Sequence, residues 1–147
     1  MSIPDSEDLF HFFFRPDDYD SSPAVGLRIR SNKFRTRGHT LSFNRASIWP
    51  LERHFEVART TWGICSVNAG ELRGVYLPEH DNPPESPKHR GPIDIDPDPY
   101  DEDPLLGIPN PSHASVNRLL NAREAERLAA HASTHIHRPP GVLNDQP

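Results

Sequence analysis

The placement of proline limits where this chain can form regular structure. Ten of its 17 prolines lie between Pro78 and Pro111, and proline fixes φ and lacks the backbone N–H that helices and sheets use. The same stretch is acidic, with nine Asp or Glu against two Lys or Arg between Glu79 and Asp103. We expect a long acidic arm over residues 78–111, held at a few apolar anchors: Ile93, Ile95, Tyr100, Leu105, Leu106 and Ile108.

Strand patterns concentrate before this arm. Residues 62–67 are rich in β-forming apolar side chains, and we expect them to be the central strand. Residues 26–30 and 41–45 alternate apolar with polar or basic side chains, as half-buried strands do. Residues 9–14 contain four phenylalanines and predict a further strand that needs cover on both faces. Residues 17–23 have the composition of a loop.

Helices are predicted on both sides of the arm. Ser47 can cap a helix that Pro50 enters near its first turn, and Leu51, Phe55 and Ala58 then recur at i, i+4 and i+7. A second helix is expected over residues 114–132, capped by Ser112 or Ser115, with an apolar side made by Val116, Leu119, Leu120, Leu128 and Ala129.

Residues 68–77 allow two interpretations. Asn68 and Gly70 tolerate positive φ, so the strand at 62–67 could turn there into a hairpin with residues 75–77, which Pro78 would end. The alternative places a single helical turn at residues 69–73. The sequence leaves both interpretations open.

Together these elements predict one α+β domain with a small, mostly antiparallel sheet, two packed helices and a long acidic, proline-rich arm. The expected segments are a flexible N-terminus (1–8), an α+β core (9–77), the arm (78–111), a C-terminal helix that completes the domain (112–133) and a tail (134–147).

Composition limits both the cellular compartment expected for this protein and the class of partner that it can bind. The net charge of −5 argues against a simple nucleic-acid binder. Cys65 is the only cysteine, which excludes an internal disulfide framework and fits a reducing compartment. The apolar run at residues 9–14 is too short and wrongly flanked for a signal peptide or membrane span. We expect a cytoplasmic protein with no membrane partner.

Two groups of potential metal ligands are incomplete in sequence. His131 and His135 would share one helical face, as two zinc ligands require, and His137 follows, but no Cys, Asp or Glu lies nearby in the chain. The aspartates at residues 94–103 resemble the start of a calcium loop, yet Pro99 stands where that loop needs glycine. We therefore predict no metal and no bound cofactor.

No nucleophile has a complete catalytic setting. Cys65 with His39 or His54 is the only thiol option, and a lone cysteine in a strand fits a buried apolar position better. Ser42 lacks the motif of a hydrolase nucleophile. His113 is the histidine of most interest, because it precedes the predicted C-terminal helix, whose N-terminus favours a bound anion. We assign no catalytic residue.

One layout resembles that of small ADP-ribosyltransferases. His11 lies on a short strand, Leu41-Ser42-Phe43 on a following strand, a helix comes next, and Glu71 comes later. This is similar to the histidine, hydroxyl and glutamate order of that family, in which the histidine grips nicotinamide dinucleotide (NAD) and the glutamate activates the acceptor. The resemblance implies an NAD-dependent transferase with His11, Ser42 and Glu71 at its site.

A basic ribbon could follow phosphates, with Phe34 or Phe43 as a stacking platform for single-stranded nucleic acid. The ribbon consists of Arg28, Arg30, Lys33, Arg35, Arg37 and Arg45. It could instead be the solvated face of a sheet, or be neutralised by the acidic residues at 79–103. We favour neutralisation or a protein partner over nucleic acid.

Our first hypothesis is an accessory subunit that binds a protein partner within a larger bacterial-type assembly, through the aromatic strand at residues 9–14 and the acidic arm. This hypothesis requires no enzymatic activity, and the sequence leaves open whether there is any. The first alternative is an NAD-dependent ADP-ribosyltransferase-like toxin, and the second is a nucleic-acid accessory protein. If the aromatic strand and the arm instead pack within the domain around a cleft lined by histidines and a glutamate, an enzyme is the better hypothesis. The predicted partner-binding residues are Phe10, Phe12, Phe14, Arg28, Arg30, Arg35, Arg37, Tyr100, Leu105 and Leu106.

Overall fold

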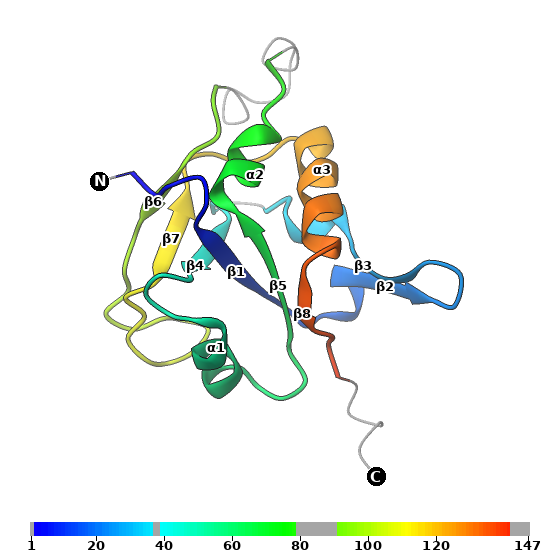
Figure 1. The fold of residues 1–147 in the computed structure, drawn as a ribbon, viewed down its shortest axis with the longest axis horizontal. Coiled ribbons are helices and arrows are strands. Elements are labelled where there is room, and N and C mark those ends of the chain that lie inside the picture. Colours follow the sequence, from blue (N-terminus) through cyan, green and yellow to red (C-terminus); the bar gives the residue numbers. More distant parts are fainter. Residues whose placement is uncertain (1, 37–38, 79–90, 142–147) are drawn as a thin grey trace.

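A six-stranded sheet organises the part of the chain that the computed structural model describes, residues 2–36, 39–78 and 91–141 (Figure 1). Every neighbouring pair of strands is antiparallel, which confirms the predicted α+β class with a mostly antiparallel sheet. Within the same residues, no helix has the length and apolar character needed to cross a membrane. The strands follow the order β6 (Ile95–Pro97), β7 (His113–Val116), β4 (Ser42–Arg45), β1 (Asp8–Phe13), β5 (Gly63–Asn68) and β8 (Ile136–Arg138).

The aromatic strand β1 lies inside the sheet because its side chains are apolar on both faces. Leu9 and Phe13 are fully buried in one core cluster, while Phe10 and Phe12, only 5% and 6% exposed, belong to another. β1 pairs with β5 over six residue pairs and with β4 on its other edge. The strand expected at residues 62–67 is β5, and it lies beside β1 instead of at the centre.

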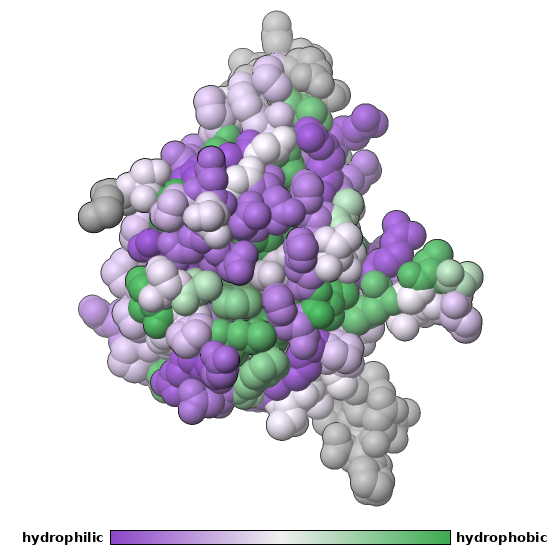
Figure 2. Space-filling model, in the orientation of Figure 1, coloured by the Kyte–Doolittle hydropathy of each residue, from purple (hydrophilic) through white to green (hydrophobic). Residues whose placement is uncertain are grey.

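The two faces of the sheet are covered by different helices. α2 (Ala69–Gly74) and α3 (Ala122–Ser133) pack in the larger core cluster, together with Phe34 and Phe43. α1 (Leu51–Val57) covers the face that carries Phe10 and Phe12. Figure 2 shows hydrophobic atoms in the lower middle of the visible face, beside α1, with hydrophilic surface around them. The sheet is therefore the middle layer of the domain.

The first two helices follow the predictions to different degrees, and a capping box decides between the two interpretations of residues 68–77. α1 begins directly after Pro50, as predicted, although Ser47 donates to Glu7 instead of capping it. The predicted apolar stripe is wrong at Phe55, which is exposed, and the buried residue of this helix is His54. Residues 69–74 form α2, so the helical turn is correct and the hairpin is wrong. Asn68 accepts the Glu71 N–H at 2.7 Å, and Glu71 accepts the Asn68 N–H at 2.9 Å. This capping box satisfies two backbone donors that a hairpin would have paired differently.

The C-terminal helix begins later than the sequence predicts. Residues 113–116 form the strand β7, with Ala114 and Val116 buried, and the helix expected from residue 114 is wrong over this stretch. α3 starts at Ala122 because Asn121 and Glu124 form a second capping box, with N–O distances of 2.9 and 3.0 Å.

Outside the predicted arm, two other stretches contain strands that were not predicted. β2 (Tyr19–Ser22) pairs with β3 (Gly26–Ile29) in a two-stranded ribbon, at the right of Figure 1, where a loop was expected before β3. Short 3₁₀ helices flank the ribbon, η1 (Pro16–Asp18) and η2 (Ser31–Lys33). β8 lies in the expected tail, and Arg138 secures it by donating to the carbonyl of Trp62 at 2.9 Å.

The described part of the predicted arm, residues 91–111, packs on the domain. Ile93 and Ile95 are 3% and 1% exposed, and β6 adds to the edge of the sheet beside β7. Tyr100 and Asn110 then pair through their backbones at 3.0 Å in both directions. An extended acidic arm is not confirmed, because this stretch is a wall of the domain; residues 79–90 lie outside the described ranges.

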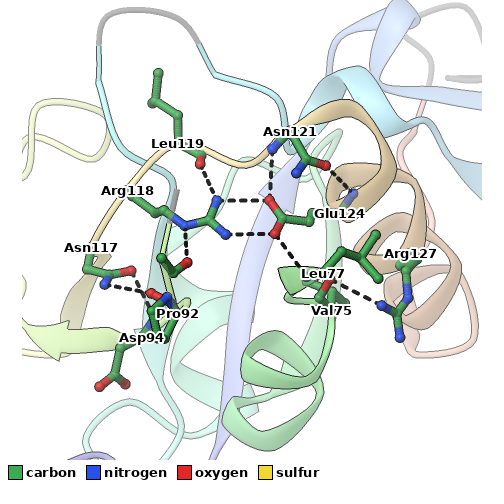
Figure 3. A network of polar contacts seen from close by, with 11 residues as sticks. Val75, Leu77, Pro92, Asp94, Asn117, Arg118, Leu119, Asn121, Glu124 and Arg127 are labelled. Atoms are coloured by element: carbon green, nitrogen blue, oxygen red, sulfur yellow. Dashed lines mark hydrogen bonds and ion pairs between the residues drawn. The ribbon is translucent and has the colours of Figure 1, made fainter. Parts of the chain in front are cut away.

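A buried ion pair joins this wall to α3 (Figure 3). Arg118 and Glu124 are 7% and 0% exposed and make two contacts, at 2.8 and 2.6 Å. Glu124 also accepts the Leu77 N–H at 3.3 Å, and Arg118 donates to the carbonyls of Gly91 and Leu119 at 2.7 Å each. Buried charges persist only where such partners replace their water, so this network fixes the chain on either side of residues 79–90 to α3.

Candidate functional site

The ladder between β1 and β4 is short, and a histidine side chain continues it. The two strands pair only at Leu9–Arg45 and Phe10–Asn44. At the next position, Nδ1 of His11 lies 2.9 Å from the backbone carbonyl of Ser42. Because a carbonyl only accepts hydrogen bonds, Nδ1 must carry the proton and donate. Nε2 of His11 is then an acceptor, and it is buried without a protein partner.

A cavity of about 330 Å³ lies beside this contact. One wall comes from Phe10, Phe12 and Phe14 on and after β1, and another comes from Tyr100 and the loop that follows it. The rim between η2 and β4 carries an ammonium, an imidazole and two hydroxyls: Lys33, His39, Thr36 and Thr40. Lys33 also lies 3.6 Å from Asp18, and the Thr36 hydroxyl donates to the His39 carbonyl at 2.6 Å. The cavity therefore combines aromatic surfaces with a polar side whose groups are partly paired within the protein.

A second histidine faces the same cavity from β7. His113 is 5% exposed, and its Nδ1 lies 2.7 Å from the carbonyl of Asp98, so Nδ1 again donates. Its ring stands 4.0 Å from that of Tyr100, centroid to centroid. Nε2 of His113 is also buried without a protein partner. Two histidines with fixed tautomers therefore line the cavity, and the Nε2 atom of each is enclosed by protein atoms.

A buried polar network holds the loop that forms the far wall. The Asn110 amide donates to Asn44 Oδ1 at 2.9 Å and to Asp103 Oδ2 at 2.8 Å. Asp103 also accepts the Leu105 N–H at 2.8 Å, and Ser112 donates to Asn110 Oδ1. Because each member is paired, the loop is anchored to β4 and has a defined position beside the cavity.

Burial keeps the imidazole of His11 on β1 and the thiol of Cys65 on β5 in their neutral forms. It lowers the pKa of His11 to about 3, with the nearby Lys33 charge acting in the same direction. Burial also raises the pKa of the Cys65 thiol to about 12. His11 is therefore an uncharged hydrogen-bonding group, and Cys65 has the properties of a buried apolar residue instead of a nucleophile.

The predicted aromatic contacts lie within the domain. Phe10, Phe12, Phe14, Tyr100 and Leu105 all line the cavity, and Leu106 packs against the core cluster on the α1 side. Phe14 also stacks on Trp62, with centroids 4.8 Å apart. Packing against the protein's own elements explains how residues 10–14 can include four phenylalanines, three of them in β1. Contact of these residues with a partner stays a prediction.

The basic ribbon pairs with acidic residues near the N-terminus. Arg30 lies 3.6 Å from Asp20, Lys33 lies 3.6 Å from Asp18, and Arg45 lies 2.9 Å from Glu7. Arg28 and Arg35 are exposed, and Arg37 lies outside the described residues. These three acidic partners lie before residue 21, whereas the prediction placed the neutralising residues at 79–103; residues 79–90 lie outside the described ranges.

Glu71 lies elsewhere, at the cap of α2. Its Oε2 is 3.1 Å from Nδ1 of His131 and 3.6 Å from Nε2 of His135, and it does not line the cavity. His137 turns to the opposite face and contacts Ser66 Oγ at 2.7 Å. Among residues 2–36, 39–78 and 91–141, no group of three or more His, Cys, Asp or Glu has the arrangement of a metal site.

Comparisons with known proteins identify no relative. No family model, no curated protein and no solved structure matches this chain. The site therefore rests on its own geometry.

Sequence inspection identified part of this site. His11, Ser42 and His113 were singled out, but as members of separate hypotheses, and only the fold brings the first and last to one cavity. The role of Asp103 and Asn110 in fixing the cavity loop was not predicted, although Asp103 was among the aspartates considered as calcium ligands. The dipeptides Asp103-Pro104 and Asn110-Pro111, typical of side chains that hydrogen-bond a turn, were the available signal.

Proposed function

We propose that the protein binds NAD in the cavity between β1 and β4 and transfers ADP-ribose to an acceptor. The observation that carries this proposal is the contact between His11 and Ser42 at 2.9 Å, at the edge of the cavity. The contact is made with the backbone carbonyl of Ser42; His11 and Ser42 are the histidine and the hydroxyl residue of the layout that resembles ADP-ribosyltransferases. They come from strands separated by more than 25 residues, and the sheet makes them neighbours.

The chemistry of the cavity supports a nucleotide ligand. The aromatic rings of Phe10, Phe12 and Phe14 offer surfaces for a planar nicotinamide ring. Neutral His11 forms part of the cavity wall, where its hydrogen bond to the Ser42 carbonyl fixes the ring. Lys33 also lines the cavity; its ammonium lies 3.6 Å from Asp18 and can meet a ligand phosphate there.

The cavity volume limits how much of the dinucleotide is enclosed. A volume of 330 Å³ is at the lower end of the range for small-molecule pockets, about 300–1,000 Å³. We expect the nicotinamide and its ribose to be enclosed, and the phosphates and adenosine to lie along the rim. Glu71 has no part in this proposal, because it caps α2 and pairs with His131 and His135.

The experiment is a titration of the full chain with NAD by calorimetry, with nicotinamide release followed by chromatography. The test variant is His11→Asn, since the Asn amide can still donate to the Ser42 carbonyl but lacks the imidazole ring that lines the cavity. Loss of the contact between this ring and the nicotinamide ring should weaken NAD binding about 3- to 10-fold. The matched control is His131→Asn, a histidine outside the cavity. Wild-type protein that shows no NAD binding at millimolar concentration overturns the proposal.

Protein binding is the second candidate function, and one observation favours it. Leu105 is 49% exposed at the tip of the cavity loop, and its neighbours Asp101 and Glu102 are exposed as well. An apolar side chain beside two carboxylates suits a partner with a basic, partly apolar surface. Co-purification of a partner that Leu105→Ser abolishes and Val25→Ser, on the β2–β3 ribbon, retains would support this candidate.

A further inference from the structure

We propose that a groove between the β2–β3 ribbon and α3 binds an extended peptide segment of a partner protein, one that carries both an acidic and a basic side chain. The groove has a volume of about 610 Å³ and shares no lining residue with the cavity between β1 and β4. It is therefore a second site, and the inference does not depend on the proposed transfer of ADP-ribose.

The floor of the groove is built from small side chains on two elements that are tied together. Ile29 on β3 and Ala129 on α3 are each 5% exposed and belong to the same core cluster. Ser133 joins them, because its Oγ accepts the Ile29 N–H at 2.9 Å and donates to the Ala129 carbonyl at 2.7 Å. Figure 1 shows β3 beside α3. The groove is thus fixed before any ligand arrives, which lowers the entropic cost of binding.

One wall of the groove carries two guanidinium groups. Arg28 on β3 and Arg30 directly after it are two residues apart in extended backbone, so their side chains leave the same face of the ribbon. Arg30 lies 3.6 Å from Asp20 with the two side chains 50% and 65% exposed, which is a loose, solvated pair. Within residues 2–36, 39–78 and 91–141, the exposed Arg28 side chain makes no hydrogen bond or ion pair. This wall can therefore receive a carboxylate.

The α3 side of the groove carries a charge of the opposite sign. Glu126 is exposed, and it too has no hydrogen bond or ion pair in the described ranges. Arg28 and Glu126 thus line the same groove without neutralising each other. A ligand that brings a carboxylate to Arg28 and an ammonium or guanidinium group to Glu126 would pair both charges.

This arrangement of charges selects a peptide over a phosphate chain. A nucleic-acid strand would meet the arginines but would be repelled by Glu126 and Asp20. A peptide with one acidic and one basic residue meets both signs, and an apolar residue between them can lie on Ile29 and Ala129. The proposal gives the predicted partner-binding residues Arg28 and Arg30 a ligand of stated chemistry, and it adds Glu126, which the sequence did not single out.

The experiment titrates fluorescein-labelled peptides with the full chain and follows fluorescence polarisation. The probes are alanine-based peptides in which one Glu and one Lys are separated by one, two or three alanines. Peptides with two Glu or two Lys at the same positions, and a single-stranded oligothymidylate, are the comparison probes. Wild-type protein should bind one of the Glu–Lys peptides more tightly than any comparison probe. Arg28→Gln should weaken that binding about 3- to 10-fold.

Two further variants test the groove itself. Glu126→Lys makes both walls positive, so its preference should change from the Glu–Lys peptide to the peptide with two Glu. Ala130→Trp places a large ring at the exposed side of the groove and should abolish binding of every peptide. The control is Glu56→Lys on α1, a side chain that is 65% exposed and does not line the groove, and it should keep the wild-type preference.

Three outcomes would overturn the proposal. Wild-type protein that binds no Glu–Lys peptide at millimolar concentration contradicts it, as does a Glu126→Lys variant that keeps the wild-type preference. Tighter binding of the oligothymidylate than of every peptide would assign the groove to a phosphate chain. Because Arg28, Glu126 and Ala130 are all exposed, we expect the three variants to fold, and thermal midpoints equal to that of the wild type check this.

Discussion

Arg118 and Glu124 form a bidentate ion pair inside the protein, with nitrogen–oxygen distances of 2.8 and 2.6 Å. Glu124→Gln would leave the Arg118 charge buried and unpaired, and would weaken the cap of α3. Removal of one partner from a buried pair costs about 3–5 kcal/mol. We expect urea denaturation to show a loss of this size in the free energy of unfolding.

The control for this prediction is an exposed ion pair. Arg53 and Glu56 lie 3.7 Å apart with side chains 43% and 65% exposed, so Arg53→Gln should change the unfolding free energy by less than about 1 kcal/mol. Equal effects of the two substitutions would mean that the Arg118–Glu124 pair contributes no more than a solvated one.

His54 should make the protein less stable in acid. Its side chain is fully buried beside the rings of Phe10 and Trp49, and burial lowers its pKa to about 4. In the unfolded chain the imidazole takes up a proton below about pH 6.5, so the unfolded state binds more protons between pH 6.5 and 4. Stability contributed by neutral His54 is present above pH 6.5 and is lost as the pH falls towards 4.

The measurement is urea denaturation at pH 7 and pH 4.5. His54 alone should account for a loss on the order of 2–3 kcal/mol, and His54→Phe, which keeps an aromatic ring in the cluster, should lose less between the two pH values. An identical pH dependence in the two proteins would contradict the prediction.

Gly63 should not tolerate even a methyl group. A Cβ at this position would lie 2.5–2.7 Å from the ring of Phe13, which is itself fully buried. Overpacking of this kind costs typically about 1–3 kcal/mol, so Gly63→Ala should lower the thermal midpoint by several degrees. Gly74→Ala, at the end of α2 with open space around it, should be neutral or slightly stabilising. If both variants melt alike, β1 and β5 are less tightly packed than described.

The Cys65 thiol should be unreactive in the native protein. Burial raises its pKa to about 12, and its Sγ faces the His11 carbonyl at 3.6 Å. Only the thiolate reacts with disulfide reagents, so modification by Ellman's reagent should be slow at pH 8 and rapid in urea. Fast modification of the native protein would show that β5 opens or that the thiol is accessible.

The sequence predicts the elements of this fold better than their arrangement. The apolar stripe of α1 and the alternation in β4 depend on neighbouring residues, and both elements formed where expected. Residues 113–116 were misassigned because Val116, Leu119 and Leu120 also fit a helical period, and only the buried position between β4 and β6 selects a strand. Tertiary context decides such short apolar runs.

The candidate site was harder to predict because its residues are distant in sequence. His11 and His113 are about a hundred residues apart, and the pairing of β4 with both β1 and β7 brings their strands to one cavity. Charge segregation was also misleading, since Arg30 and Lys33 find Asp20 and Asp18 near at hand. The number of charged residues in a segment does not show which of them form ion pairs.

The two ends of the main sheet have a consequence for behaviour in solution. β6 and β8 each contain three residues; β6 ends at Pro97, and Pro139 and Pro140 follow β8. Short edges bounded by proline give an approaching chain few backbone groups to pair with. We therefore expect that concentrating the protein does not cause its molecules to associate edge to edge through this sheet.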